Sequence, residues 1–293
     1  MPRFTPEQVR RRQLVAGALV LLLVLVIGGC TVTLLGALRG GNGSDASAGE
    51  PFRADDAAMI VEATSADAAV LANLPEGIEL AADEVMGIDV SSHQGEIDWA
   101  QVAGDGVVFA YVKATEGSGF VDSSFRRNWD GARAAGITPG AYHYFTLCSP
   151  GADQAADFLA AAPPDDSALP PALDLEFDGA CEERPEAARA QAEIDAFTAA
   201  VEREWGRRLV IYSSVEWRDH YGLPVAGPRP DWLFSAGERP EQEDWAVWQL
   251  RFDGDVAGIS GGVDIDVARI EVLRDQAAID EGEAAIEHAS TGA

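Results

Sequence analysis

The sequence predicts an α/β fold: a closed barrel of five strand–helix units and three further strands, preceded by one transmembrane helix and a flexible linker. Short apolar runs alternate with helical patterns between residues 86 and 214, which is typical of a parallel sheet with helices outside it. Three more apolar runs follow, separated by loops too short for full helices. Eight strands is the number that closes such a barrel.

The expected strands are Met86–Ser91, Val107–Ala114, Ile137–Phe145, Leu169–Phe177, Arg208–Ser214, Trp232–Ser235, Trp245–Leu250 and Val263–Val267. The expected helices are Trp99–Ala103, Ser123–Ala135, Ala152–Ala162 and Pro185–Trp205. An open, doubly wound sheet is the alternative arrangement. The first strand lacks the phosphate-binding glycine pattern that would favour that arrangement.

The composition excludes some classes of function. The chain has 293 residues, a formal net charge of -28 and a pI near 4.3, and this length has room for one large domain or two modest ones. Binding to nucleic acid requires clustered Lys and Arg, so we expect no nucleic-acid partner. The acidity suits a soluble domain that is exported from the cell.

An apolar segment near the N-terminus is long enough to cross a bilayer. Residues 14–38 contain no charged residue, and about 20 apolar residues suffice for a transmembrane helix. Arginines cluster before this segment, so the positive-inside rule places residues 1–13 in the cytoplasm. We therefore expect a single-pass protein of a bacterial cell membrane, with its catalytic domain outside the cell.

Two alternatives to the anchor stay open, namely a lipoprotein attached through Cys30 and a secreted protein with a cleaved signal peptide. All three place the body of the chain outside the cytoplasm. We expect residues 39–85 to form an acidic, flexible linker with at most a short helix near Ala57–Leu74. Residues 86–275 are the expected barrel, and residues 276–293 are an acidic C-terminal tail.

Two carboxylates lie inside the fourth expected strand. Asp174 and Glu176 are two residues apart, so they share one face of the strand. Desolvation and like-charge repulsion would leave one of them protonated beside an ionised partner, and that pair can cleave a glycosidic bond. The alternative is an ordinary surface network in which both acids pair with Arg or Lys.

Other polar and aromatic residues also stand late in the expected strands, where a barrel of this kind builds its active site. They are Asp89, Lys113, Glu116, Tyr142, His143, Tyr144, Tyr212, Trp248, Gln249, Asp264 and Asp266. Carboxylates ringed by aromatic side chains suit a carbohydrate, because sugar rings present apolar faces and hydroxyl groups.

Six motifs in order resemble one known family. They are Gly87-Ile-Asp-Val-Ser-Ser-His-Gln-Gly95, Val112-Lys-Ala-Thr-Glu-Gly117, Gly140-Ala-Tyr-His-Tyr-Phe145, Ala172-Leu-Asp-Leu-Glu176, Trp248-Gln249 and Gly262-Val-Asp-Ile-Asp266. The chain from about Met86 to Leu273 is similar to the glycoside hydrolase family 25 lysozymes of the Chalaropsis type. The resemblance implies a (β/α)5(β)3, TIM-like barrel and an N-acetylmuramidase, which hydrolyses peptidoglycan between N-acetylmuramic acid and N-acetylglucosamine.

The resemblance also implies roles for individual residues. Glu176 matches the general acid, and Asp174 matches the residue that orients the substrate's N-acetyl group or stabilises the transition state. Asp89 and Asp264 match the family's remaining acids, which position substrate and water. The residues expected to bind the sugar chain are Tyr142, Tyr144, Trp248 and Lys113, the last mainly by pairing with the acids. Whether the N-acetyl group or a water attacks first stays open.

The sequence departs from the family at two positions. Asp266 stands where Asn is usual and would raise the pKa of a neighbouring acid, and Leu250 stands where an aromatic residue is common and would thin the sugar platform. Cys148 and Cys181 follow neighbouring strands, so we expect a disulfide between them in an exported domain. We expect no cofactor and no metal, a monomer, and peptidoglycan as the partner.

Two other functions are weighed against this enzyme. A module that binds peptidoglycan without cutting it would be favoured by loss of Asp174 or Glu176, and both are present. A metal-dependent sugar deacetylase would use His93 and His143 with Asp89. Zinc sites usually need a third well-placed His or Cys, and the sequence offers none with supporting spacing.

Overall fold

The computed structural model describes residues 61–177, 179, 181–222 and 229–279, all within one compact unit, Phe52–Ala293. The expected cytoplasmic segment, transmembrane helix and C-terminal tail beyond residue 279 lie outside the described residues. Within the described ranges, no helix is both long enough and apolar enough to span a membrane.

The strands form one sheet that closes on itself. They are β1 (Glu84–Val90), β2 (Phe109–Glu116), β3 (Phe120–Val121), β4 (Thr138–Tyr144), β5 (Ala172–Leu175), β6 (Val210–Ser213), β7 (Asp231–Phe234), β8 (Val247–Gly254) and β9 (Val263–Arg269). The sheet order is β1-β9-β8-β7-β6-β5-β4-β2-β3, and pairing of β1 with β2 closes a ring of eight strands. Neighbouring strands in the ring are parallel except at β9, which is antiparallel to β8 and β1. The expected barrel is confirmed.

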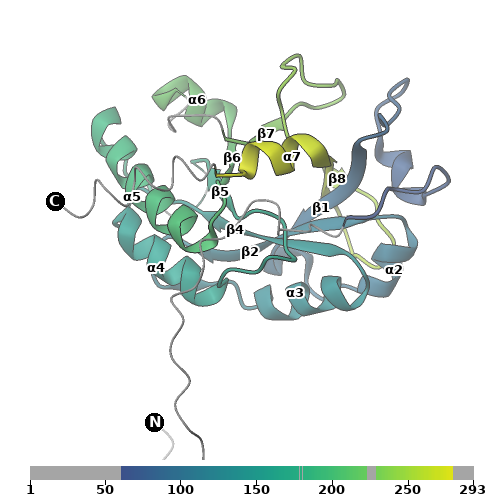
Figure 1. Ribbon diagram of the computed structural model, residues 1–293, viewed down its shortest axis with the longest axis horizontal. Helices are drawn as coiled ribbons and strands as arrows, with labels where there is room; N and C mark the ends of the chain where they lie inside the picture. Colours follow the sequence, from purple (N-terminus) through teal and green to yellow (C-terminus); the bar gives the residue numbers. More distant parts are fainter. Residues whose placement is uncertain (1–60, 178, 180, 223–228, 280–293) are drawn as a thin grey trace, which may run out of the picture. The chain divides into compact units, whose positions relative to one another are not determined.

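Helices surround this barrel (Figure 1). They are α2 (Trp99–Gly104), α3 (Phe125–Ala134), α4 (Gly151–Ala161), α5 (Ala187–Trp205), α6 (Val215–Tyr221) and α7 (Ile270–Ala277), with 3-10 turns η2 (Ala69–Asn73) and η3 (Ser92–Gln94). The sequence did not predict β3 or α6, and the acidic tail expected from residue 276 overlaps the end of α7. In the structure α7 covers the amino-terminal end of the barrel, where Leu273 joins the interior core.

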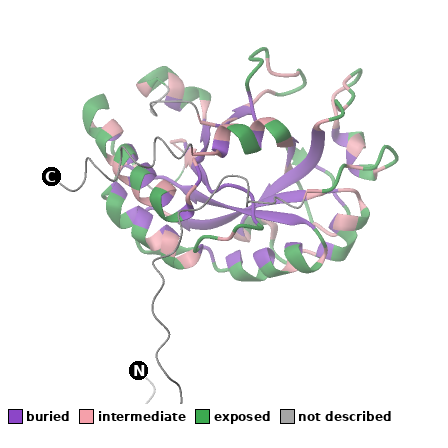
Figure 2. Ribbon diagram, in the orientation of Figure 1, coloured by how far each residue is buried: buried purple, intermediate pink, exposed green. Residues whose placement is uncertain are grey.

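Alternation along the strands sorts side chains into two cores. Outward-facing residues such as Ile88 and Leu173 pack with Phe158 and Phe197 of the helices. Inward-facing residues such as Tyr111 fill the lower part of the barrel. Figure 2 shows the result, with buried strands at the centre and helices that expose their outer faces. Each large apolar side chain buried in this way stabilises the fold by about 1.5–3 kcal/mol.

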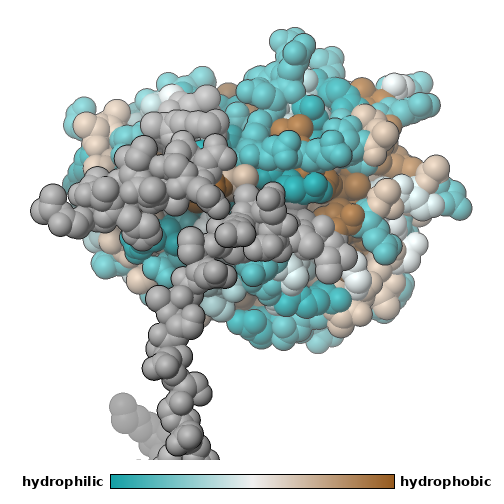
Figure 3. Space-filling model, viewed as in Figure 1, coloured by the Kyte–Doolittle hydropathy of each residue, from teal (hydrophilic) through white to brown (hydrophobic). Residues whose placement is uncertain are grey.

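The surface is mostly hydrophilic on the face seen in Figure 3, and hydrophobic residues gather there only in small areas. Among the described residues, the large apolar side chains that stand out into solvent are Phe120, Val121, Val215 and Phe252. Three of these four belong to β2–β3 and β8–β9 hairpins, which extend from the barrel ring.

The end of the expected linker packs against the barrel instead of forming a flexible chain. We call residues 61–83 the N-terminal strap. Val70 of the strap is fully buried in the helix-facing core. The Asn73 side chain donates to the carbonyl of Asp255 and accepts from its N–H, each at 3.0 Å. The expectation of a flexible linker up to residue 85 is therefore wrong for the strap, which belongs to the folded domain.

Candidate active site

A cavity of about 550 Å³ opens at the carboxyl ends of the parallel strands. Every strand of the ring contributes to it: Asp89 from β1, Lys113 and Glu116 from β2, Tyr142 and Tyr144 from β4, Asp174 from β5, Tyr212 from β6, Trp232 from β7, Gln249 and Phe252 from β8, and Asp264 from β9. Glu176 and Gly179 line it just beyond β5, and Ser91, His93 and Gln94 line it beyond β1. Barrels of this kind carry their active sites at this end.

Strand geometry explains why the acids meet. Asp174 and Glu176 share a face, while Leu173 and Leu175 on the opposite face are fully buried in the helix-facing core. Asp89 and Asp264 are directly opposite each other in the antiparallel pair β1–β9, an arrangement that brings side chains to one face about 5 Å apart. The pairing of β1 with β9 brings Asp89 and Asp264 together, and the two-residue spacing brings Asp174 and Glu176 together, so four carboxyl groups line a single cavity.

Asp89 and Asp264 form a buried cluster on β1 and β9 together with a further acid, Asp266. Burial and the charges of Asp264 and Asp266 raise the pKa of Asp89 well above its ordinary value, although Gln249 donates to Asp89 Oδ2 at 2.9 Å and opposes that shift. Burial raises the pKa of Asp264 to about 6. Asp266 is fully buried below them and accepts a hydrogen bond from Trp232 Nε1 at 3.0 Å. Three carboxyl groups this close resist ionising together.

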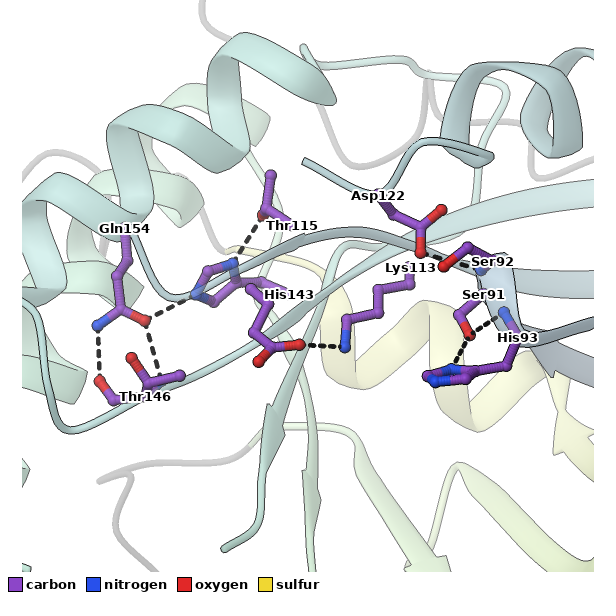
Figure 4. A network of polar contacts seen from close by, with 10 residues as sticks. Ser91, Ser92, His93, Lys113, Thr115, Asp122, His143, Thr146 and Gln154 are labelled. Carbon is purple, nitrogen blue, oxygen red and sulfur yellow. Dashed lines mark hydrogen bonds and ion pairs between the residues drawn. The ribbon is translucent and has the colours of Figure 1, made fainter. Parts of the chain in front are cut away.

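Asp174, on the other side of the cavity, is under the influence of a nearby cation, Lys113. Burial and the charge of Glu176 raise the pKa of Asp174 well above its ordinary value, and the charge of Lys113 opposes this rise. Lys113 Nζ is 2.6 Å from Glu116 Oε2 and 4.5 Å from the centre of the Tyr144 ring. Figure 4 shows Lys113 between the contacts of His143 and those of Ser91 and His93. Lys113 therefore partly neutralises the acids on its side of the cavity.

The structure places seven of the eight residues expected to act on substrate around this one cavity. They are Asp89, Lys113, Tyr142, Tyr144, Asp174, Glu176 and Asp264. Trp248 is the exception: its side chain is fully buried outside the barrel, and its Nε1 donates to the carbonyl of Ser235 at 2.8 Å. The expectation that Trp248 lines the sugar groove is corrected, because its neighbour Gln249 faces the cavity and adjacent residues of a strand face opposite ways.

Leu250, like Trp248, points away from the cavity. It is 2% exposed and packs in the helix-facing core, so its departure from the family does not thin a sugar platform. The departure at Asp266 acts in the expected direction, since its charge raises the pKa of Asp89. Two cavity residues, Trp232 and Phe252, were not singled out from the sequence. Polar and aromatic residues late in the expected strands were the signal, but Trp232 begins its expected strand and Phe252 lies beyond the end of the expected strand Trp245–Leu250.

The structure also separates the histidines of the metal-site hypothesis. His143 faces away from the cavity and contacts Thr115 Oγ1 at 2.7 Å and Gln154 Oε1 at 3.0 Å (Figure 4). Its ring stacks on Phe197. Its burial lowers the pKa to about 4, so it is neutral. His93 contacts Ser91 Oγ at 2.9 Å on the cavity rim. The two rings therefore have different surroundings and do not form a ligand set with Asp89.

A disulfide braces the rim of the cavity. Cys148, after β4, is bonded to Cys181, after β5, with the two Cα atoms 5.8 Å apart. The bond ties together the loops that follow Tyr144 and Glu176, two residues of the cavity wall. The expected disulfide is confirmed.

The fold and the site together define a class of enzyme: an α/β-barrel glycoside hydrolase whose cavity is lined by acids and aromatic side chains. Residues 88–259 match the family described as Glycosyl hydrolases family 25. The chain belongs to this family, and its resemblance to the family's lysozymes is confirmed.

Individual relatives agree with this assignment. Lysozyme M1 of Streptomyces globisporus is 34% identical over 194 residues, which are 61% of this chain and 66% of the relative. A family 25 glycosyl hydrolase from Bacillus anthracis superposes with a TM-score of 0.60 at 31% identity, covering 65% of this chain and 91% of that one. The bacterial lysozyme from Streptomyces coelicolor gives a TM-score of 0.57 at 31% identity, covering 66% of this chain and 98% of that one.

Proposed function

We propose that this enzyme hydrolyses the β-1,4 bond between N-acetylmuramic acid and N-acetylglucosamine in peptidoglycan. The observation that carries the proposal is the pair of carboxyl groups that line the cavity, Asp174 on β5 and Glu176 just beyond its end. Glycosidic cleavage needs one carboxyl that donates a proton and a second that is ionised. The relatives named lysozymes support this substrate class.

Burial and the charge of Glu176 raise the pKa of Asp174 well above its ordinary value, because two carboxyl groups this close resist ionising together. Glu176 donates a proton to the leaving oxygen, since it lies beyond the end of β5 on the cavity wall. Asp174 Oδ1 is buried and has no hydrogen-bond partner among the described residues. This oxygen would accept the N–H of the substrate's N-acetyl group.

The remaining residues hold the substrate. Asp89 and Asp264 orient the sugar hydroxyl groups and the water, while Tyr142 and Tyr144 present aromatic surface to the sugar rings. Burial and the surrounding carboxylates raise the pKa of Tyr142 well above its ordinary value, so its hydroxyl group stays protonated and remains a hydrogen-bond donor. No metal enters this scheme.

The test is product analysis on purified peptidoglycan. We expect the full-length chain to release muropeptides with new reducing ends on N-acetylmuramic acid, detected by mass spectrometry. Glu176→Gln removes the proton donor and should slow release about 10²–10⁴-fold. Glu204→Gln changes an exposed carboxylate on α5 and serves as the matched control. An intact wall that nevertheless sediments with the protein would show a binding module instead of an enzyme.

We also propose that residues 14–38 hold the enzyme at the outer face of a bacterial cell membrane, where it acts on nearby peptidoglycan. The support is the uncharged apolar segment and the arginines that precede it. Membrane fractionation of cells that produce the full chain tests this location. Recovery of a shortened chain from the medium would favour a cleaved signal peptide, and labelling by a lipid precursor that is lost in Cys30→Ser would favour a lipoprotein.

A further inference from the structure

One exposed aromatic side chain on the cavity rim has no role in the scheme above. Phe252 is 54% exposed, yet it lines the active-site cavity. Its ring stacks on Phe234 with the centroids 4.2 Å apart and the planes at 22°. Phe234 lies at the end of β7 and is partly buried against the interior core. One face of the Phe252 ring is therefore supported, while much of the side chain remains open to solvent.

A β-bulge aims this ring at the cavity. In β8, Gln249 pairs with Asp266, whereas Arg251 pairs with Ile265, so β8 advances two residues while β9 advances one. Strict alternation would put Phe252 on the outer face with Trp248, because both have even numbers. The extra residue reverses the alternation and turns Phe252 inward, as bulges beside active sites commonly do.

Phe252 lies on the opposite side of the cavity mouth from Tyr144. In the closed ring, β8 and β4 are four strand positions apart in either direction, so Phe252 and Tyr144 occupy opposite sides of the cavity. The acids Asp89, Asp174 and Asp264 line the space between these sides. A sugar chain that passes over the acids from the Tyr144 side reaches Phe252 at the far side.

We propose that Phe252 is a binding platform for a pyranose ring of the glycan chain, one that lies outside the pair of sugars joined by the cleaved bond. The apolar C–H face of a sugar ring stacks on the flat, supported face of Phe252 and removes both from water. Phe252 is a substrate-binding residue for longer chains and takes no part in the proton transfers. This proposal rests on the proposed function, since the chain it binds is the substrate of the same cavity.

The test compares glycan strands of two lengths in the full-length protein. With long strands, Phe252→Ala should raise KM about 3- to 10-fold and change kcat less than twofold. With a disaccharide-repeat fragment too short to reach the rim, both constants should stay close to those of the wild type. Phe252→Tyr keeps a flat ring and should restore the KM for long strands. Phe120→Ala removes a 48% exposed ring on β3 that does not line the cavity, and it is the control.

A binding measurement separates this proposal from the proposed function. Long glycan strands are titrated into Glu176→Gln and into the double variant Glu176→Gln/Phe252→Ala by calorimetry, with no turnover required. Weaker binding in the double variant supports the platform even if the wild type cuts no peptidoglycan. Equal affinity, or an equal loss with short and long strands, overturns it. Phe252→Leu repeats the comparison if Phe252→Ala unfolds, since Leu keeps apolar volume but has no flat face.

Discussion

At the scale of single residues, Asp266 adds a third carboxyl group beside Asp89 and Asp264. It is fully buried, its Oδ1 is bonded to Trp232, and its charge raises the pKa of Asp89. Asp266→Asn removes that charge and keeps an oxygen for the Trp232 N–H. The pKa of Asp89 should fall, so the limb of the kcat/KM profile that follows ionisation of Asp89 should move to lower pH.

The measurement is kcat/KM on soluble glycan between pH 4 and pH 9, because this ratio reports ionisation in the free enzyme. Asp253→Asn, which changes an exposed carboxylate on the same hairpin, is the control. An unchanged profile in Asp266→Asn would show that Asp266 is protonated throughout this range and exerts no charge on Asp89.

The acids could be predicted residue by residue because a strand has a period of two. That period predicted that Asp174 and Glu176 share a face. Asp89 and Asp264 were predicted from their places late in the expected strands and from the resemblance to the family, and the structure adds that they pair across β1 and β9. The same rule would have excluded Trp248, since it is adjacent to Gln249 and the two cannot share a face. The prediction for Trp248 was wrong because it considered that the residue is aromatic and not which face of the strand it occupies. In the structure, Trp248 packs beside Trp245.

At the scale of elements, the disulfide ties the loop after β4 to the loop after β5. Its two cysteines are 33 residues apart, and in the chain-entropy model closing such a loop stabilises the fold by about 3–4 kcal/mol. The double variant Cys148→Ser/Cys181→Ser should lose about that free energy of unfolding in urea. Reduction of the wild type should reproduce the loss. Equal midpoints for the wild type and the double variant would contradict the prediction.

His143 couples β4 to α4 and α5 through Gln154 and Phe197. Its folded pKa is about 4, whereas an unfolded histidine has a pKa of about 6.5. The unfolded chain binds the extra proton between these values, so the stability contributed by neutral His143 is present above pH 6.5 and is lost as the pH falls toward 4. The full loss is about 3 kcal/mol.

Comparison with His143→Phe separates the pH dependence caused by His143 from the pH dependence caused by the Asp and Glu residues. The free energy of unfolding of the wild type minus that of the variant should decrease steadily from pH 7 to pH 4. Loss of the contacts with Thr115 and Gln154 lowers the stability of the variant at every pH and does not change the slope. A difference that stays constant with pH would sink the prediction.

The regular strands and helices were predictable because their apolar periods continue over several residues. The two-residue strand β3 and the short helix α6 carry too few positions to show a period. The bulge in β8 arises from its pairing with β9, and pairing is not written in the local sequence. Phe252 could not be assigned to the cavity for this reason.

At the scale of the whole molecule, the folded domain begins earlier than the composition indicated. The strap holds scattered apolar residues, among them Val70 and Leu74, at no helical or strand period. The sequence of such a segment is like that of a linker, because the surface on which it packs is formed by other parts of the chain. The packing of the strap depends on the turn after α2, where the Asp105 carbonyl accepts the Val70 N–H, and on the loop between β8 and β9.

Asn73 is the point at which the strap can be tested most sharply. Its side chain is 6% exposed and satisfies both the carbonyl and the N–H of Asp255 at 3.0 Å. Asn73→Ala leaves two backbone groups of a part-buried loop without these partners, and each such loss costs about 1–3 kcal/mol. We expect the variant to lose about 2–4 kcal/mol of unfolding free energy, measured by urea titration, whereas Glu76→Ala at an exposed position of the strap should lose less than about 0.5 kcal/mol.

A truncation extends this test to the whole strap. A chain that starts at residue 84 retains all nine strands but exposes the surface that Val70 covers, and it also removes the Thr64 Oγ1 that accepts the Met86 N–H at 2.8 Å. It should unfold at lower urea than a chain that starts at residue 61. If both chains unfold at the same midpoint, the strap rests on the barrel without stabilising it. If the longer chain is the more stable, the strap stabilises the folded domain, and its contact with Met86 of β1 is one source of that stability.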